Sequence, residues 1–124
     1  LNFIQENELI YEIDPIQMSI RLLIPPKSSL LKLKDIRKHI VDFQPERFSH
    51  IWKHPNPKME ILNSNISAVV EKHATLNKDA LETFIAIKKE FSEIFPKLAN
   101  IQNVTIRTKR VTVKPPKLTE SWFC

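Results

Sequence analysis

The segment that most constrains the fold is an apolar run, residues 16–24, with prolines on both sides. A short run of Ile and Leu between turn signals predicts a buried β-strand. Asp14 and Pro15 mark its start, because a residue before proline is disfavoured in the helical region. Pro25 and Pro26 end it, because neither can donate a ladder hydrogen bond. Since the apolar residues spill onto both faces, the run is typical of a parallel sheet inside an α/β protein.

Arg21 is the one charge inside this run, and a charge there must be paired or reach water. Two interpretations remain open. The guanidinium either pairs with a nearby carboxylate or snorkels to solvent, or it contacts an anion at the carboxyl end of the strand, where α/β sheets bind ligands. Ser28 or Ser29, just after the prolines, supplies a side-chain oxygen that caps a new helix.

Two amphipathic helices are predicted in the second half of the chain. Asn56 caps the first, 57–75, whose apolar residues recur at spacings of three and four. Asn77 caps the second, 78–95. Because the link is short, we expect an antiparallel hairpin with the aromatic side chains in its core. A weaker helical pattern covers 28–43, although part of it alternates as a strand would.

A proline-rich connector precedes these helices. It predicts a short helix over 45–52, with Trp52 anchored on the core. His50 and His54 are four residues apart, a spacing that can bind a metal on a helix. A proline directly after His54 breaks such a helix and no third ligand has motif spacing, so we predict no metal site. His54 is instead expected to be a fixed hydrogen-bonding residue.

The C-terminal part is basic and alternates apolar and polar residues over 104–108 and 110–113, as a half-exposed strand would. Residues 97–117 hold no acid. The strip is either a solvated surface or a nucleic-acid footprint. In the second case the contacts come from Arg107, Lys109, Arg110 and Lys114.

Composition excludes several classes of site and compartment. The chain has no glycine, which rules out the glycine-rich loops that hold nucleotide phosphates. Its single cysteine cannot form an internal disulfide, and no apolar run approaches the ~20 residues that span a bilayer. The expected location is therefore the cytoplasm, with no membrane partner.

Three stretches resemble, in the same order, segments of one protein family. Residues 14–28 (D-P-I-Q-M-S-I-R-L-L-I-P-P-K-S) resemble its D-P-V-Q-Y-(S/T)-I-R-L-L-(I/V)-P-P-G-S. Residues 52–60 (W-K-H-P-N-P-K-M-E) resemble its W-R-H-P-D-P-R-M-D, and 118–124 (L-T-E-S-W-F-C) its L-(S/T)-E-P-W-F-C. The family comprises radical SAM proteins similar to the B12-dependent branch, with a tail of Cys-Cys-Ala-Glu-Pro or Cys-selenocysteine-Ala-Glu-Pro.

The chain also departs from this family. Lys27 stands where the family has glycine and Ser121 where it has proline, and the family's C-x-x-x-C-x-x-C cluster motif and barrel are missing. Together with a start at Leu1 and an end at Cys124, this leads us to expect the C-terminal portion of a longer protein. A UGA codon for selenocysteine after Cys124 would fit that expectation, and a UAA or UAG codon would refute it.

The resemblance implies a fragment that is not catalytic alone. Its 4Fe–4S cluster, SAM and B12 would be held by the missing N-terminal barrel, and its substrate would be a small molecule or a peptide. Cys124 would be a redox or acceptor thiol, and Arg21, Ser28 and His54 would lie near substrate or cofactor.

The expected fold is α+β and helix-dominated. Residues 1–31 would end a partial TIM-type barrel with one buried strand, 32–99 would form a helical extension, and 100–124 a basic strand and extended tail. Two other readings of the function remain open. One is a stand-alone basic helical module that binds nucleic acid or a partner protein, and the other is a non-functional remnant.

Overall fold

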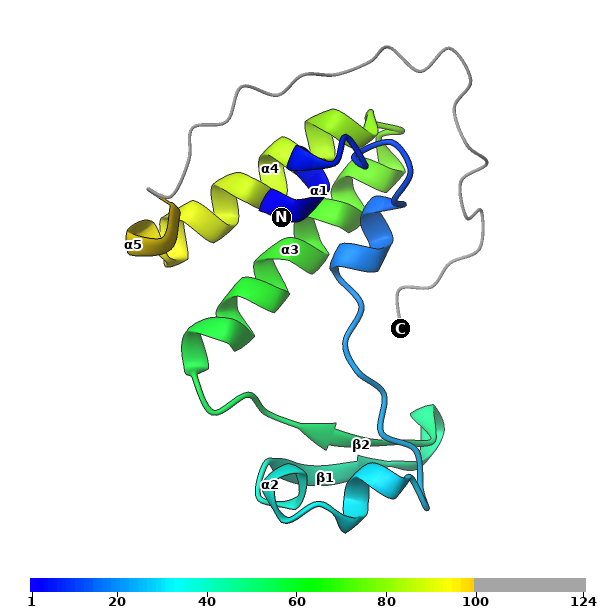
Figure 1. Ribbon diagram of the computed structural model, residues 1–124. Helices are drawn as coiled ribbons and strands as arrows, with labels where there is room; N and C mark the ends of the chain where they lie inside the picture. The colour runs from blue at the N-terminus through cyan, green and yellow to red at the C-terminus, as the bar shows by residue number, and fades with distance from the viewer. Residues whose placement is uncertain (100–124) are drawn as a thin grey trace. The chain divides into compact units, whose positions relative to one another are not determined.

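The computed structural model of the chain describes residues 1–99, and helices predominate in it (Figure 1). It divides into two compact units: Leu1–Ile20 together with the chain from Leu62 onward, and Arg21–Ile61. The elements are, in order, α1 (Asn2–Glu6), the 3₁₀ helix η1 (Pro15–Met18), η2 (Ser29–Lys32), α2 (Lys34–Arg37), β1 (Ile40–Gln44), η3 (Pro45–Arg47), β2 (Ser49–Trp52), α3 (Pro57–Thr75), α4 (Ala80–Ile94) and α5 (Pro96–Ala99).

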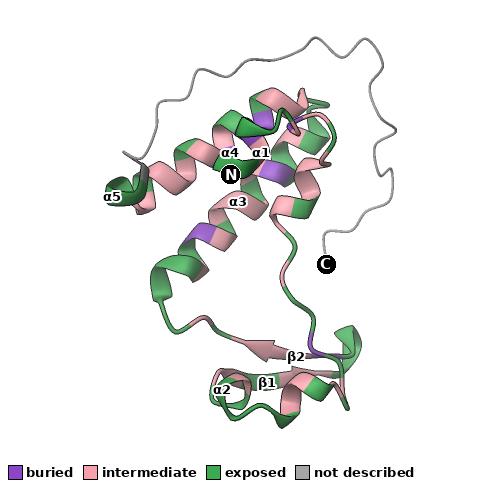
Figure 2. Cartoon of the chain, in the orientation of Figure 1, coloured by how far each residue is buried: buried purple, intermediate pink, exposed green. Residues whose placement is uncertain are grey.

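The helical unit is built on the predicted hairpin of α3 and α4. Leu62 and Val70 of α3 and Phe84 of α4 are buried at positions of the predicted stripes, and Figure 2 shows buried stretches on both helices. At the next position α4 differs from the prediction, because it buries Ile87 while the predicted Ile85 is 49% exposed. Removing such side chains from water is the main stabilising contribution to a small core. The prediction of two helices that present apolar stripes to each other is therefore confirmed.

Hydrogen bonds between the two helices fix their direction. Asn65, in the first half of α3, donates to the Glu90 carboxylate near the end of α4 at 2.8 Å. His73, near the end of α3, is hydrogen-bonded to Thr83 near the start of α4. The two helices are therefore antiparallel, as expected from their short link.

The helix caps agree with the sequence at one position and differ at another. The Asn56 side chain accepts from the Lys58 backbone N–H, which confirms it as the cap of α3. The cap of α4 is Asp79, which accepts from the Leu81 N–H, so the prediction of Asn77 is wrong by two residues. Asn77 instead has a φ of 50°, a left-handed conformation that asparagine tolerates at a turn.

Within the helical unit, the N-terminal segment is joined to α4 and its cap by polar contacts. Lys88 of α4 donates to the side chain of buried Gln5 at 2.5 Å, and Ile10 is buried. Burial, with the charge of and hydrogen bond to Asp79, raises the pKa of Tyr11. The Gln5–Lys88 and Tyr11–Asp79 contacts thus attach the residues before the apolar run to α4 and its cap.

The second unit, Arg21–Ile61, is built on an antiparallel pair of strands. β1 pairs with β2 in a register that places Phe43 opposite His50, with their ring centroids 5.0 Å apart, and a bulge follows Ile40. η3 joins the strands and ends at Phe48, whose φ is 48°. On the other edge of β2, buried Ile24 forms a single bridge with His50.

The predicted strand over 16–24 is wrong. Asp14 accepts from the Ile16 N–H and Pro15 opens η1, so the Asp-Pro pair is a helix cap followed by a first-turn proline. After Ser19 the chain forms no ladder before the single bridge at Ile24, and Ile20 and Leu23 are 67% and 69% exposed. In the described structure, residues 1–31 accordingly hold one bridge residue, Ile24, and no β-strand.

The helices predicted over 28–43 and 45–52 are both shorter in the structure than expected. The segment 28–43 begins as predicted, with Ser28 capping η2, but helix ends at Arg37 of α2 and β1 follows. The predicted helix over 45–52 ends at Arg47, because the left-handed Phe48 cannot continue it. In both segments the pairing of β1 with β2 overrides the local helical pattern.

Among residues 1–99, no helix combines the length and apolarity that crossing a membrane requires. The predicted strand over 104–113 and the extended tail lie outside the described residues.

Candidate functional site

Arg21 is at the centre of a hydrogen-bonded cluster, which we call the Arg21 cluster, formed with Trp52, His54, Asn56 and Glu60. Its guanidinium binds the Glu60 carboxylate in a two-pronged fork, with Nη1 2.7 Å from Oε2 and Nη2 3.1 Å from Oε1. Nη2 also donates to the backbone carbonyl of Trp52 at 2.7 Å. Fork geometry of this kind is the strongest arrangement available to an arginine and a carboxylate.

Trp52 contributes its ring and both of its polar groups to this cluster. The Arg21 Cζ lies 4.5 Å from the centroid of the Trp52 ring, a cation–π contact. The indole N–H donates to the Leu22 carbonyl at 2.8 Å. The indole N–H is therefore bonded, but to the backbone of exposed Leu22, so the predicted anchoring of Trp52 on the core is not seen.

His54 and Glu60 join the cluster to the start of α3. The His54 backbone N–H donates to Glu60 Oε1 at 2.6 Å, and His54 Nδ1 accepts from the Asn56 backbone N–H at 3.0 Å. Because Nδ1 accepts, the neutral ring carries its proton on Nε2. His54 is thus a fixed hydrogen-bonding residue, as the sequence predicts.

Electrostatics favour the ionised form of Glu60. The hydrogen bonds from Arg21 and then from the His54 backbone lower the pKa of Glu60 against the opposing effect of desolvation. Arg21 and Glu60 keep 35% and 29% of their side-chain surface exposed, so solvent weakens the pair. Of the two interpretations of Arg21, the structure agrees with the carboxylate pair.

The chemistry of this arrangement is that of a clamp. Arg21 is held by a carboxylate, a carbonyl and an aromatic ring, and both oxygens of that carboxylate accept hydrogen bonds from the chain itself. Sequence reasoning named Arg21 and His54 but missed Glu60 as their common partner. The signal was available, because Glu60 occupies the acidic position that ends the second family-like stretch.

Ser28 lies outside this cluster and has a local role. Its Oγ accepts from the Leu30 N–H at the start of η2, and its own N–H donates to the Pro25 carbonyl at 3.1 Å. Residues 25–28 therefore form a β-turn. Proline fixes a negative φ at Pro26, and Lys27 has a φ of 67°, so the turn is type II.

Lys27→Gly is expected to raise the free energy of unfolding of residues 21–61 by about 1 kcal/mol, because glycine adopts the left-handed region without a Cβ clash. Chemical denaturation followed by Trp52 fluorescence, in a Trp122→Phe background, measures the change. Lys32→Gly, at the helical end of η2, is the matched control and should destabilise. Equal effects at both positions would contradict the assigned turn.

The two histidines considered for metal binding do not share a helix. His50 lies in β2 against Phe43, and His54 uses Nδ1 to accept a backbone N–H. Within residues 1–99, no three His, Cys, Asp or Glu side chains lie close enough to hold a metal ion.

The remaining predicted site residues lie outside the described part of the chain. They are the candidate thiol Cys124 and the basic residues Arg107, Lys109, Arg110 and Lys114.

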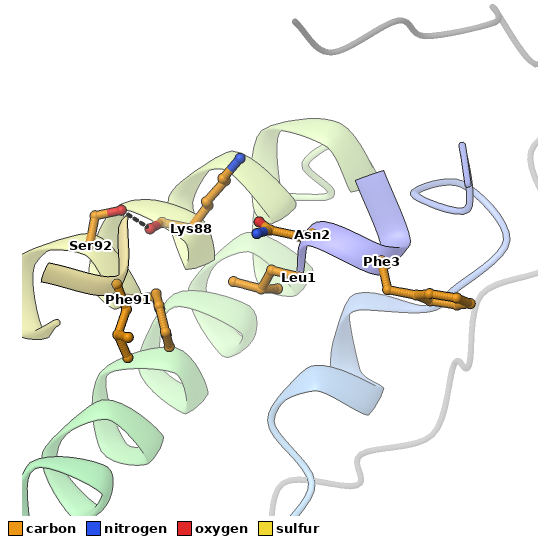
Figure 3. Close-up of a pocket in the computed structure, with 7 residues that line it drawn as sticks. Leu1, Asn2, Phe3, Lys88, Phe91 and Ser92 are labelled. Atoms are coloured by element: carbon orange, nitrogen blue, oxygen red, sulfur yellow. Dashed lines mark hydrogen bonds between the residues drawn. The ribbon is translucent and has the colours of Figure 1, made fainter. Parts of the chain in front are cut away.

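A pocket of about 370 Å³ lies on the helical unit, between the N-terminal residues and α4 (Figure 3). Lys88 is the side chain in its lining with acid–base chemistry, and it donates to Gln5. Ser92 donates to the Lys88 backbone carbonyl, so its proton is also in use (Figure 3). The lining therefore lacks a paired nucleophile and base.

The Arg21 cluster is the feature that best connects structure and sequence. No protein-family model, curated protein or solved structure matches the chain.

Proposed function

We propose that the chain is the C-terminal part of a radical SAM enzyme of the B12-like branch, supplying a cover and a cysteine tail without being catalytic alone. The observation that carries the proposal is the Arg21 cluster. Arg21 comes from the first family-like stretch, and Trp52, His54 and Glu60 come from the second. Two stretches matched separately by sequence thus supply the two halves of one interaction.

The turn at residues 25–28 supports the same proposal. The family pattern has glycine at the position of Lys27, and Lys27 has a positive φ. A type II turn favours proline followed by glycine at its two central positions. The family motif P-P-G-S therefore describes the backbone that this chain adopts with lysine.

The cofactors of such an enzyme are assigned to residues outside this chain. A radical SAM cluster takes three cysteine thiolates, and the chain has one cysteine. The 4Fe–4S cluster, SAM and B12 belong in this proposal to an N-terminal barrel of the same protein, the partner of the chain. Cys124 is proposed as the redox or acceptor thiol of the tail, and the substrate as a small molecule or peptide.

Anaerobic expression of the complete reading frame tests this function. After chemical reduction, the complete protein is expected to convert SAM to 5′-deoxyadenosine, measured by chromatography, while residues 1–124 alone produce none. SAM cleavage by residues 1–124 would overturn the proposal, as would a reading frame without C-x-x-x-C-x-x-C upstream.

A further inference from the structure

The net positive charge of the chain lies in its second unit. Residues 21–61 hold nine Lys or Arg and four Asp or Glu, a formal charge of +5. The described part of the first unit, residues 1–20 and 62–99, holds five and nine, a formal charge of −4, and the whole unit through Cys124 holds ten of each. This division cannot be recognised before the units are known, because the second unit interrupts the first in sequence.

Within the second unit the positive charge is concentrated on residues 27–38, which we call the basic segment. Lys27, Lys32, Lys34, Arg37 and Lys38 are all exposed. The packing of η2 against α2 brings part of the set together, and Arg37 Nη2 lies 3.5 Å from the Lys32 carbonyl. The cations of α2 and the residue after it lie within one turn of each other.

Ion pairing leaves most of this charge uncompensated. Lys38 pairs with Asp35 at 2.7 Å, and within residues 1–99 the other four cations form no ion pair. On the helical unit, by contrast, Lys78 and Lys89 each have a carboxylate one turn away. Like charges three or four residues apart repel each other on a helix, and among Lys34, Arg37 and Lys38 a carboxylate offsets this repulsion at Lys38 alone.

We propose that the basic segment binds the phosphodiester backbone of nucleic acid without sequence specificity. Exposed lysines and arginines neutralise phosphates and release condensed counterions, which drives such binding. A membrane fits less well. The four-residue elements form no continuous amphipathic helix, and Leu30, Leu31 and Ile36 are half-buried, with Leu33 the exposed exception. This role is additional to the proposed enzyme function and independent of it.

Fluorescence anisotropy of the whole chain tests the proposal with two probes, a labelled 20-base-pair DNA duplex and a 20-nucleotide oligouridine. Binding should weaken linearly on a log–log plot between 50 and 200 mM salt. Replacing Lys27, Lys32, Lys34 and Arg37 by Gln should weaken binding at least tenfold at 50 mM salt and make the slope shallower by about 2–4 for the duplex. The two probes show whether one form of the backbone is preferred.

Two matched sets of four substitutions locate the site. Replacing Lys72, Lys78, Lys89 and Lys97 by Gln changes the net charge equally and should alter affinity less than threefold. Replacing Arg107, Lys109, Arg110 and Lys114 by Gln tests the other basic strip. The assignment to the basic segment would be overturned if the four substitutions at 72–97 reduced affinity as much as those in the basic segment, or if only those at 107–114 reduced it. Circular dichroism checks that each variant is folded.

Absence of binding to both probes would also overturn the proposal. So would binding to phosphatidylserine vesicles by a chain that binds neither nucleic acid. Deoxyadenosine formation by the complete enzyme is measured separately, so failure here leaves the proposed function standing, and the reverse also holds.

Discussion

Glu60→Gln is expected to lower the free energy of unfolding of residues 21–61 by about 1–2 kcal/mol, toward the low end for hydrogen bonds to charged groups because the pair is partly exposed. The carboxylate accepts two bonds from Arg21 and one from the His54 N–H. The glutamine amide has one oxygen for these donors, and its NH₂ group faces at least one of them. The cluster therefore loses hydrogen bonds as well as charge.

Trp52 fluorescence during urea denaturation measures this effect, with Trp122→Phe leaving Trp52 as the single tryptophan. Glu46→Gln is the matched control, because Glu46 is exposed on η3 and should change stability by less than 0.5 kcal/mol. If both variants unfold at the same urea concentration, the fork does not stabilise this unit.

The same variant gives the pH dependence. Because the pKa of Glu60 is lowered in the folded chain, its stabilisation is complete above the unfolded carboxyl pKa of about 4.3. The stabilisation is lost as pH falls through the lower folded pKa. Glu60→Gln should therefore flatten the acid limb of the stability profile of residues 21–61. An unchanged acid limb would assign that limb to other carboxylates.

Phe84→Ala is expected to destabilise the helical unit by about 3–5 kcal/mol. The Phe84 side chain is 0% exposed in the core of α3 and α4, so truncation removes buried apolar surface and leaves a cavity. This loss reaches the lower end of the stability of a small domain, which is about 5–15 kcal/mol. We therefore expect most of the helical unit of this variant to be unfolded at 37 °C.

Thermal melting followed by circular dichroism at 222 nm checks this result. Ile85→Ala is the neighbouring control, because Ile85 is 49% exposed on the same helix, and it should cost about 1 kcal/mol or less. A larger effect at Ile85 than at Phe84 would mean that α4 buries its other face.

The helices could be predicted from sequence because their signals are local. The bounds of α3 agree with the prediction to the residue, since Asn56, Pro57 and the apolar spacing lie within the helix or beside it. The strands could not be predicted in this way. Each depends on the other for its hydrogen bonds, and the bulge after Ile40 disturbs the alternation that would identify β1.

The Arg21 cluster was only partly predictable, because local sequence signals do not identify distant partners. A charge within an apolar run requires a partner, which identifies Arg21 as paired but not with which residue. Glu60 is 39 residues away in sequence, and its contact depends on the turn at residues 25–28 and on the start of α3. The apolar run itself was misinterpreted, because Asp14 and Pro15 can begin either a strand or a helical turn.

The extended segment beside β2 has a consequence for colloidal behaviour. An uncovered strand edge can act as a template for another chain. Here side chains bond the backbone groups between β2 and the segment before Ile24 in place of a regular ladder. Arg21 donates to the Trp52 carbonyl, the Trp52 indole donates to the Leu22 carbonyl, and the Ser49 hydroxyl accepts from the Ile24 N–H. Self-association by strand addition is thus discouraged on this border by side chains, which a foreign peptide would have to displace.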